Sequence, residues 1–341
     1  AGMIPLIGVH GASWLVALTA GSLAVVISQR KWSLLLLPLV IWGGAFALQS
    51  VEWTKPTGEP IKAALIQGNV PQEIKWDPQQ LRNTLQLYAD LSRQHWDADV
   101  IVWPENAATA FYHQIDEGYL APLGREARSQ NTDILLGLPV LDENGEDYYN
   151  SMVSLTDTPV FYHKRHLVPF GDYVPFETLR GLIKFFDLPM SAFVPGSADQ
   201  PQMLLAGQPV GVSICYEDAF SLEVRDTVPA STLLINATNN AWYGDSFAPH
   251  QHLQISRSRG LETGRPILRV TTNGISAFID HRGKLQQQSP QFELAVLTGE
   301  IQPRDGITPY VRLGQWPLLI CILLLLGLWA YYQLLQRRND S

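Results

Sequence analysis

Long uncharged stretches occupy both ends of the chain, while nearly all ionisable residues lie between about positions 52 and 312. Three of these stretches, 11–28, 32–51 and 316–335, are long enough to cross a membrane. About twenty apolar residues in a helix span a bilayer core of roughly 30 Å, and the last stretch has Trp and Tyr near its ends, where interfacial aromatics occur. The pattern predicts three transmembrane helices, with a buried or re-entrant segment as the alternative for the first.

The basic residues near these stretches predict their orientation. Arg30 and Lys31 form the short turn between the first two stretches, and Arg337 and Arg338 follow the third. Positively charged loops favour the cytoplasmic side, so we expect both clusters inside and the domain between the second and third helices outside the cytoplasm. The chain begins without an initiator methionine, as if in mid-sequence, and we expect further membrane helices upstream of it.

The middle region, 61–312, alternates apolar runs with stretches of helical spacing. Strands are predicted at 61–70, 99–106, 133–141, 149–155, 160–170, 210–219, 231–242, 267–280 and 294–301, and helices at 81–94, 117–129 and 249–263. The last strands have the pattern of antiparallel pairs around residues 281–283. Alternating strands and helices followed by such pairs predict an α/β domain with a mixed sheet covered by helices.

Composition narrows the classes of partner. Apolar residues make up 46% of the chain and charged residues only 16%, and the net charge is -8 at pH 7. With no basic patch, nucleic acid is not an expected partner. We expect no cofactor, because the glycine-containing stretches match neither of the common nucleotide-binding motifs. No metal is expected, because the histidines form no HExxH arrangement and no Cys/His spacing indicates zinc.

The chain has two cysteines, Cys215 and Cys321. Cys321 lies within the C-terminal apolar stretch and Cys215 in the polar middle region. We expect no disulfide between a membrane-buried thiol and a thiol of the middle domain. Cys215 is therefore a lone thiol that requires its own explanation.

Three polar groups stand where predicted strands end. Glu105 ends the run IVWPE, Lys164 lies in VFYHKRH, and Cys215 ends VGVSIC. Strand ends of α/β sheets commonly form ligand sites. A thiol with an ordinary pKa of about 8.5 needs a base and a nearby cation to act as a nucleophile, and Glu105 and Lys164 supply these groups. Taken singly, each residue also has a structural explanation. Cys215 could be a packed core residue, Glu105 a carboxylate at a helix start, and Lys164 a solvated charge at a strand end.

Four sequence motifs occur in order: WPEN at 103–106, HKRHLVPFGDYVP at 163–175, CYED at 215–218 and NNAWYG at 239–244. They resemble the nitrilase, or carbon-nitrogen hydrolase, superfamily, whose triad is Glu, Lys and Cys in this order. The HLVPFG phrase and the flanking apolar helices resemble the apolipoprotein N-acyltransferase family in particular. The resemblance implies an α/β fold, a nitrilase-like αββα sandwich flanked by transmembrane helices.

The resemblance also implies roles for individual residues. Cys215 would be the acylated nucleophile, Glu105 the general base and Lys164 the stabilising cation. Tyr216 and Glu217 match positions that complete the site, and the backbone N–H of Tyr216 is a candidate oxyanion donor.

Other positions are expected to support the site or to meet lipid. Asp172 stands where the family often has Glu, which leaves its role open. Trp76 matches a family aromatic that contacts lipid. Phe185 and Phe186 lie in the apolar segment 179–194, for which we weigh a lid that dips toward lipid against a core helix and turn.

The function that the resemblance implies is acyl transfer. A phospholipid would donate an acyl chain to Cys215 as a thioester, and the N-terminal amine of a diacylglyceryl-cysteine apolipoprotein would accept it. The expected location is the bacterial inner membrane, with the domain on the periplasmic side and the chain a monomer. The alternatives are a membrane-anchored amidase that uses water as acceptor, and a non-enzymatic lipoprotein-binding protein, which the presence of all three triad residues disfavours.

Overall fold

The computed structural model describes residues 1–173 and 192–339. Its contacts divide the chain into two compact units. The helical unit comprises Ala1–Lys55, Leu261–Gly264 and Gly306–Ser341, and the sheet unit comprises Pro56–Gly260 and Arg265–Asp305.

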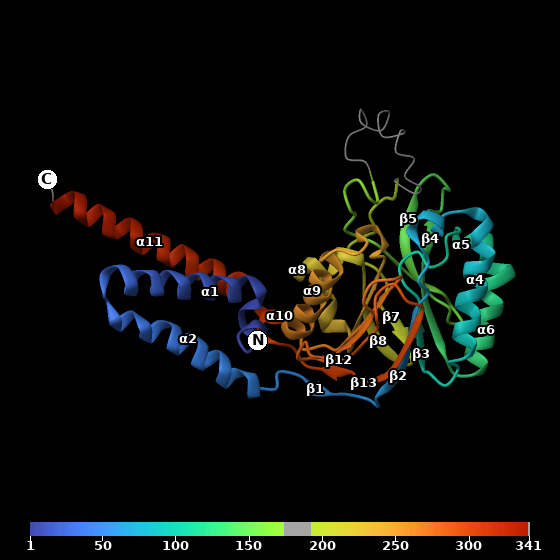
Figure 1. Cartoon of the computed structure of the whole chain (residues 1–341), viewed down its shortest axis with the longest axis horizontal. Coiled ribbons are helices and arrows are strands. Elements are labelled where there is room, and N and C mark those ends of the chain that lie inside the picture. The colour runs from blue at the N-terminus through green and yellow to red at the C-terminus, as the bar shows by residue number, and fades with distance from the viewer. Residues whose placement is uncertain (174–191, 340–341) are drawn as a thin grey trace. The chain divides into compact units, whose positions relative to one another are not determined.

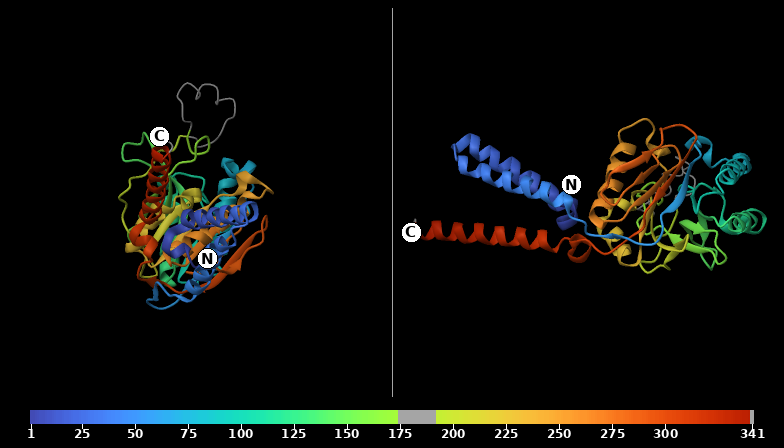
Figure 2. Two further views of the ribbon diagram at one scale, coloured as in Figure 1. Left: turned by 90° about the vertical axis from the view of Figure 1, so that its left-hand side faces the viewer. Right: turned by 90° about the horizontal axis from the view of Figure 1, so that it is seen from below.

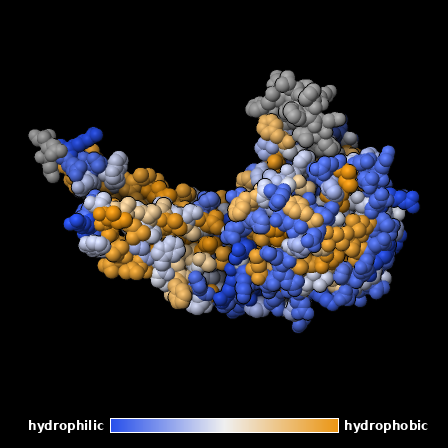
Figure 3. All heavy atoms as spheres, in the orientation of Figure 1, coloured by the Kyte–Doolittle hydropathy of each residue, from blue (hydrophilic) through white to orange (hydrophobic). Residues whose placement is uncertain are grey.

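The helical unit carries the apolar ends of the chain. Its elements are α1 (Ile4–Gln29), η1 (Trp32–Leu35), α2 (Leu36–Ala47), η2 (Leu48–Ser50), α10 (Pro309–Leu313) and α11 (Trp316–Asn339). Within the described residues, three segments have the length and composition to cross a membrane: Ile4–Gln29, Trp32–Ser50 and Trp316–Arg338. Their surfaces are largely apolar (Figure 3), and few of their side chains are buried, as expected for helices that lie in lipid. The first segment is therefore a long exposed helix rather than a buried core segment.

The first helix begins earlier than the hydrophobic pattern predicted, and it is kinked. Gly8 has a φ of 68° inside α1, and the ring of Tyr310 lies so close that a Cβ at this position would be 2.5 Å from it. The kink takes the N–H of Val9 out of the helical hydrogen-bond ladder, and it donates instead to Glu262 Oε1 at 2.8 Å. A carboxylate at the start of a helical stretch satisfies an N–H that has no helical acceptor.

The sheet unit contains two six-stranded mixed sheets, where the sequence pattern predicted one. In spatial order the first is β13 (Ala295–Ile301), β2 (Ile61–Gln67), β3 (Val100–Val102), β4 (Asp133–Leu141), β5 (Tyr148–Ser154) and β6 (Val160–His163). The second is β12 (Leu285–Gln288), β11 (Ala277–Ile279), β10 (Ile267–Thr271), β9 (Leu233–Thr238), β8 (Gln208–Ile214) and β7 (Met203–Leu205). Each has three parallel central strands, β2–β3–β4 and β8–β9–β10, with antiparallel strands outside them.

Helices cover the outer face of each sheet, and the inner faces pack against each other (Figures 1 and 2). The helices are α4 (Pro78–Arg93) and α6 (Ala121–Ser129) on the first sheet and α8 (Ser221–Thr227) and α9 (Ala248–Thr263) on the second. The core between the sheets is built from buried strand residues, among them Leu65, Val102, Leu135, Ile214 and Ile235. The expected αββα sandwich is thereby confirmed.

Shorter elements connect these layers. They are β1 (Lys55–Pro56), α3 (Gln72–Lys75), α5 (Tyr112–Ile115), η3 (Asp116–Leu120), η5 (Cys215–Ala219), η6 (Val228–Ala230), η7 (Ala241–Tyr243) and β14 (Arg304–Asp305).

Two apolar runs are shorter as strands than the pattern predicted. The run 267–280 divides into β10 and β11, which pair antiparallel across a turn, and β11 then pairs with β12 across residues 281–283, as expected. The run 160–170 is a strand only to His163, after which the chain leaves the sheet. This departure places the residues after β6 in a loop at the strand ends, where the candidate site lies.

Candidate active site

Glu105 follows β3 and is buried, with an exposed fraction of 5%. Its Oε1 accepts hydrogen bonds from Lys164 Nζ at 3.1 Å and Asn150 Nδ2 at 2.8 Å, and its Oε2 accepts one from the backbone N–H of Asn239 at 2.8 Å. Three donors from three different segments therefore hold the carboxylate in one orientation. Since buried carboxylates are costly without partners, this pocket is built for an ionised Glu105.

Lys164, the first residue after β6, is buried among carboxylates. Its Nζ lies 2.8 Å from Asp172 Oδ2 and 3.1 Å from Glu105 Oε1. Asp172 Oδ2 also accepts the backbone N–H of Val168 at 2.8 Å, which fixes the loop between them. The shorter acid at position 172 thus reaches the lysine directly, and one ammonium stands between two carboxylates.

We expect Asp172→Asn to slow acylation of Cys215 by a p-nitrophenyl ester roughly 10- to 100-fold. It keeps the shape of the side chain but removes a charge-assisted hydrogen bond worth about 1.5–3 kcal/mol. Asp172→Glu keeps the charge and should stay within about fivefold of the wild-type rate. The burst of nitrophenol measures both rates. Equal rates for the wild type and the Asn variant would show that the Lys164–Asp172 pair does not matter for the site.

Cys215 directly follows β8 and begins η5 in an unusual backbone conformation. Its φ of 56° lies in the left-handed region, which costs a non-glycine residue about 1–3 kcal/mol and is frequent at functional sites. The residue is 7% exposed, and it lines the same pocket as Glu105 and Lys164. The three residues of the expected triad, which are far apart in sequence, therefore lie at one rim of the sandwich.

The protonation states of the three groups follow from their surroundings. Burial, reinforced by the negative charge of Glu105, raises the pKa of the Cys215 thiol to about 12, although Lys164 acts in the opposite direction. Burial opposes ionisation of Glu105, but the charge of Lys164 and the hydrogen bond from Asn150 hold its pKa below the ordinary value. The pKa of Lys164 is well above its ordinary value, because the neighbouring carboxylates outweigh burial. At neutral pH the site holds a carboxylate, an ammonium and a protonated thiol.

The pocket has a volume of about 260 Å³ and a mostly apolar wall. Its lining includes aromatic and aliphatic side chains around the polar triad, namely Trp76, Val168, Pro169, Phe170, Phe193, Trp242 and Tyr243. Trp76, expected to meet lipid, is part of this wall. Phe185 and Phe186, expected to do the same, lie outside the described residues.

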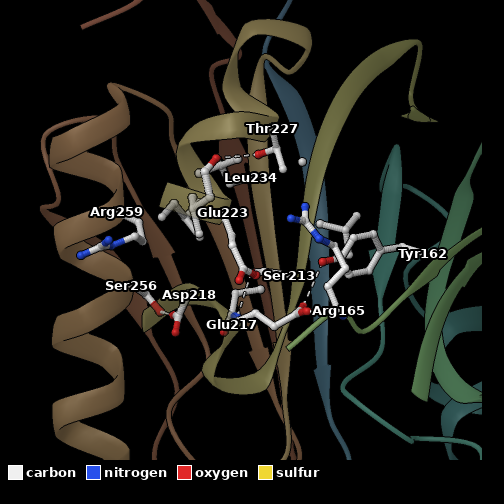
Figure 4. A pocket seen from close by; sticks show the side chains of 15 residues that line it. Tyr162, Arg165, Ser213, Glu217, Asp218, Glu223, Thr227, Leu234, Ser256 and Arg259 are labelled. Atoms are coloured by element: carbon white, nitrogen blue, oxygen red, sulfur yellow. Dashed lines mark hydrogen bonds between the residues drawn. The ribbon is translucent and has the colours of Figure 1, made fainter. Parts of the chain in front are cut away.

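Glu217 joins the segment that carries the lysine to the segment that carries the nucleophile (Figure 4). Its Oε1 accepts the backbone N–H groups of Arg165 at 2.6 Å and His166 at 3.0 Å. Its Oε2 accepts the N–H of Ile214 at 2.6 Å and the hydroxyl of Tyr162 at 3.0 Å. Glu217 therefore fixes the spacing between the loop after Lys164 and the end of β8 and does not line the triad pocket.

Tyr216 follows the nucleophile, and its side chain points to the loop after β6. The hydroxyl donates to the carbonyl of Leu167 at 2.8 Å. The backbone N–H of Tyr216 lies in the first turn of η5, where N–H groups have no helical acceptor. It is thus available to a ligand beside Cys215.

Sequence reasoning missed three partners of Glu105. Asn150 is a polar residue within an apolar strand, and this break in the apolar pattern could have marked it as a site residue. Asn239 belongs to the motif NNAWYG, but it donates through its backbone N–H, which its residue type does not reveal. Lys75 Nζ donates to the carbonyl of Glu105 at 3.0 Å, and burial lowers the pKa of this lysine to about 8. Nothing in the local sequence distinguishes Lys75 from an exposed lysine.

No group of three or more His, Cys, Asp or Glu side chains that could hold a metal ion occurs in 1–173 or 192–339.

The sequence was compared with known families and proteins. The carbon-nitrogen hydrolase family model matches residues 62–308. An apolipoprotein N-acyltransferase of Methylococcus capsulatus is 45% identical over 317 residues, covering 92% of this chain and 63% of that protein. One of Vibrio vulnificus is 42% identical over 353 residues, covering 100% of this chain and 69% of that protein. The chain thus spans about two thirds of the length of these relatives.

Solved structures share the fold at low sequence identity. A carbon-nitrogen hydrolase from Helicobacter pylori superposes with a TM-score of 0.55 at 14% identity, covering 71% of this chain and 89% of that one. An amidase of the nitrilase superfamily from Nesterenkonia AN1 superposes with a TM-score of 0.54 at 19% identity, covering 75% of this chain and 95% of that one. The family match and the curated relatives show that the chain belongs to the carbon-nitrogen hydrolase family and, within it, to the apolipoprotein N-acyltransferase group.

Proposed function

We propose that this chain transfers an acyl chain from a phospholipid, through a thioester on Cys215, to the N-terminal amine of a diacylglyceryl-cysteine apolipoprotein. The observation that carries the proposal is the buried contact of Glu105 with Lys164 in a pocket that also exposes Cys215 to an apolar wall. The names of its relatives support the same reaction.

In the first half-reaction, Cys215 Sγ attacks the ester carbonyl of the phospholipid while Glu105 takes the thiol proton. General-base assistance is required because the thiol is protonated at neutral pH. The developing oxyanion would be stabilised by Lys164 Nζ and the backbone N–H of Tyr216. The carbon–oxygen bond then breaks, Glu105 returns the proton to the departing lysophospholipid hydroxyl, and the acyl group remains on sulfur.

In the second half-reaction, the neutral amine of the lipoprotein attacks the thioester carbonyl. Glu105 takes a proton from the attacking nitrogen, the carbon–sulfur bond breaks, and the same proton restores the Cys215 thiol. A thioester is reactive enough toward an amine for this step, and the two half-reactions give ping-pong kinetics. This mechanism needs one active site, so we propose that a monomer suffices.

The apolar helices support a membrane location for both substrates. Three helices of membrane-spanning length and an aromatic pocket wall fit an enzyme whose donor and acceptor are both lipid-anchored. With Arg30, Lys31, Arg337 and Arg338 on the cytoplasmic side, the sheet unit would face the periplasm of a bacterial inner membrane. No nucleic acid or cofactor enters the proposed reaction.

A membrane-anchored amidase is the second candidate, because an amidase of the nitrilase superfamily has the same fold. The two activities use the same triad and differ in the acceptor, which is an amine in one case and water in the other.

Incubation of the detergent-solubilised chain with phospholipid and a diacylated lipopeptide tests the proposal. We expect an N-acylated peptide and an equal amount of lysophospholipid, both measured by mass spectrometry. With a lipopeptide whose amine is already acetylated, we expect the thioester and about one equivalent of lysophospholipid, and no further turnover. Continuous release of fatty acid with the blocked peptide, or ammonia from amides, would instead support the amidase.

A further inference from the structure

The carbonyl oxygen of the candidate nucleophile is held by two side chains. Asn236 Nδ2 donates to the Cys215 carbonyl at 3.0 Å, and His252 Nε2 lies 3.1 Å from the same oxygen. Asn236 belongs to β9 and His252 to α9, so two elements next to β8 reach back to one peptide group. That peptide group follows the left-handed φ of Cys215 and is the one that carries the N–H of Tyr216.

These contacts close into a ring of hydrogen bonds. His252 Nδ1 lies 3.2 Å from Asn240 Nδ2, and Asn240 Oδ1 accepts from Arg269 at 3.3 Å. Arg269 also donates to Asn236 Oδ1, whose amide nitrogen returns to the Cys215 carbonyl. The amide of Asn240 can only donate to Nδ1, so Nε2 of His252 carries the proton, which it shares between the Cys215 carbonyl at 3.1 Å and Asp218 Oδ1 at 3.0 Å.

Asp218 lies beside the ring, and its carboxylate balances the positive charge of Arg269. Its Oδ1 is 3.0 Å from His252 Nε2, and its Oδ2 accepts from Ser256 Oγ and, at 3.5 Å, from Arg269. All of these side chains are buried, and Arg269 has no exposed surface. Arg269 Nε has no partner among the described residues, but the other contacts pair buried polar groups with one another, and a rearrangement would leave more donors or acceptors unpaired.

None of the ring side chains lines the triad pocket. Asp218, Asn236 and Ser256 line a separate small cavity of about 20 Å³, which has room for about one water molecule (Figure 4). The ring therefore lies outside the reach of a substrate in the triad pocket.

We infer that Asn236, Asn240, His252 and Arg269, with Asp218, are positioning residues for acyl transfer: by clamping the Cys215 carbonyl, they keep the nucleophile in its left-handed conformation. This conformation aims Sγ into the pocket and leaves the N–H of Tyr216 directed at the forming oxyanion. The inference rests on the proposed function, since it assigns the ring to the acylation step.

The test separates acylation, which needs the oxyanion donor, from alkylation by iodoacetamide, which needs only the thiol. It uses a Cys321→Ser background, so that Cys215 is the single thiol. In His252→Leu and Asn236→Leu, each lacking one donor to the carbonyl, we expect single-turnover thioester formation from phospholipid to fall about 10²- to 10³-fold, the effect of losing an oxyanion donor. Alkylation should stay within about threefold.

Two further variants sharpen the comparison. His252→Gln retains a donor and an acceptor, and we expect it to recover acylation to within about tenfold of the wild type. His250→Leu makes the same change at an exposed position of α9 and should leave both rates unchanged.

Three results would overturn the inference. They are wild-type acylation in both Leu variants, an equal fall in acylation and alkylation, and loss of folding by circular dichroism in both, which would make the ring a requirement of the core. Wild-type protein that forms no thioester would argue against the proposed function itself, and the ring inference would fall with it. Wild-type thioester with unchanged variants would reject the ring alone.

Discussion

Cys215→Ser should reduce transfer of an acyl chain to the lipopeptide by roughly 10⁴-fold or more, as removal of a nucleophile does in enzymes that form acyl intermediates. The serine hydroxyl is a much weaker nucleophile than the thiol. We also expect the acyl adduct on the protein, seen by intact mass after mixing with phospholipid alone, to disappear. Serine is nearly isosteric, so the fold and the pocket should be unchanged.

The other cysteine provides the matched control. Cys321 lies in α11 of the helical unit, outside the triad pocket, and Cys321→Ser should retain both transfer activity and the acyl adduct. Full activity in Cys215→Ser, or an adduct that persists in it, would contradict the mechanism proposed here.

Lys164→Met should abolish acylation and also destabilise the sheet unit by about 3–5 kcal/mol at neutral pH, the usual effect of removing one partner from a buried ion pair. The lysine is 1% exposed and lies within 3.1 Å of two carboxylates, and the variant removes the ammonium that stands between them. Methionine has nearly the same length, so the loss would come from charge rather than from a cavity. Urea unfolding monitored by fluorescence measures the free energy.

The effect should depend on pH in a defined direction. The pKa of Glu105 is lowered in the folded wild type, so this carboxylate contributes stability above its unfolded pKa of about 4.3, and the contribution is lost as pH falls through the folded value. Lys164→Met removes the largest of the interactions that lower this pKa, while the hydrogen bonds from Asn150 and Asn239 and the charge of Lys75 remain. We therefore expect the difference in unfolding free energy between wild type and variant to be largest near neutral pH. It should shrink as pH falls, from the pH at which Glu105 becomes protonated in the folded variant down to the lower pH at which it becomes protonated in the folded wild type.

Lys62→Met is a suitable control. Lys62, on β2, forms an exposed ion pair with Asp97, and neither residue pairs with Glu105, Lys164 or Asp172. Exposed pairs contribute little, so it should unfold like the wild type. A Lys164→Met variant as stable as Lys62→Met at neutral pH would contradict the assigned ion pair.

The protonation states in the pocket and the backbone conformation of Cys215 serve the same proposed reaction. An ionised base and a protonated thiol allow the proton to move only as the carbon–sulfur bond forms, which avoids a permanently charged thiolate in an apolar pocket. In the proposed mechanism, the left-handed backbone at Cys215 and the two contacts to its carbonyl would direct the N–H of Tyr216 toward the new negative charge.

The sequence by itself determined the local elements and the types of reacting group. The apolar run 133–141 is β4 with the same bounds, the helix expected at 249–263 is α9 (Ala248–Thr263), and the three long apolar stretches are the three helices of membrane-spanning length. These features depend on the period and length of apolar runs, which are local properties of the sequence. The motifs likewise predict Glu105, Lys164 and Cys215 as the reacting groups, and these residues line one pocket.

Only the tertiary structure decided which groups meet. Strands buried on both faces have no alternation to show which sheet they join, so the division into two sheets was invisible in the pattern. Glu105 receives a backbone hydrogen bond from Asn239, 134 positions away, and Arg269 closes a ring around a carbonyl 54 positions before it along the chain, at Cys215. Such contacts depend on how whole layers pack, because the local pattern specifies each strand and helix but not its neighbours.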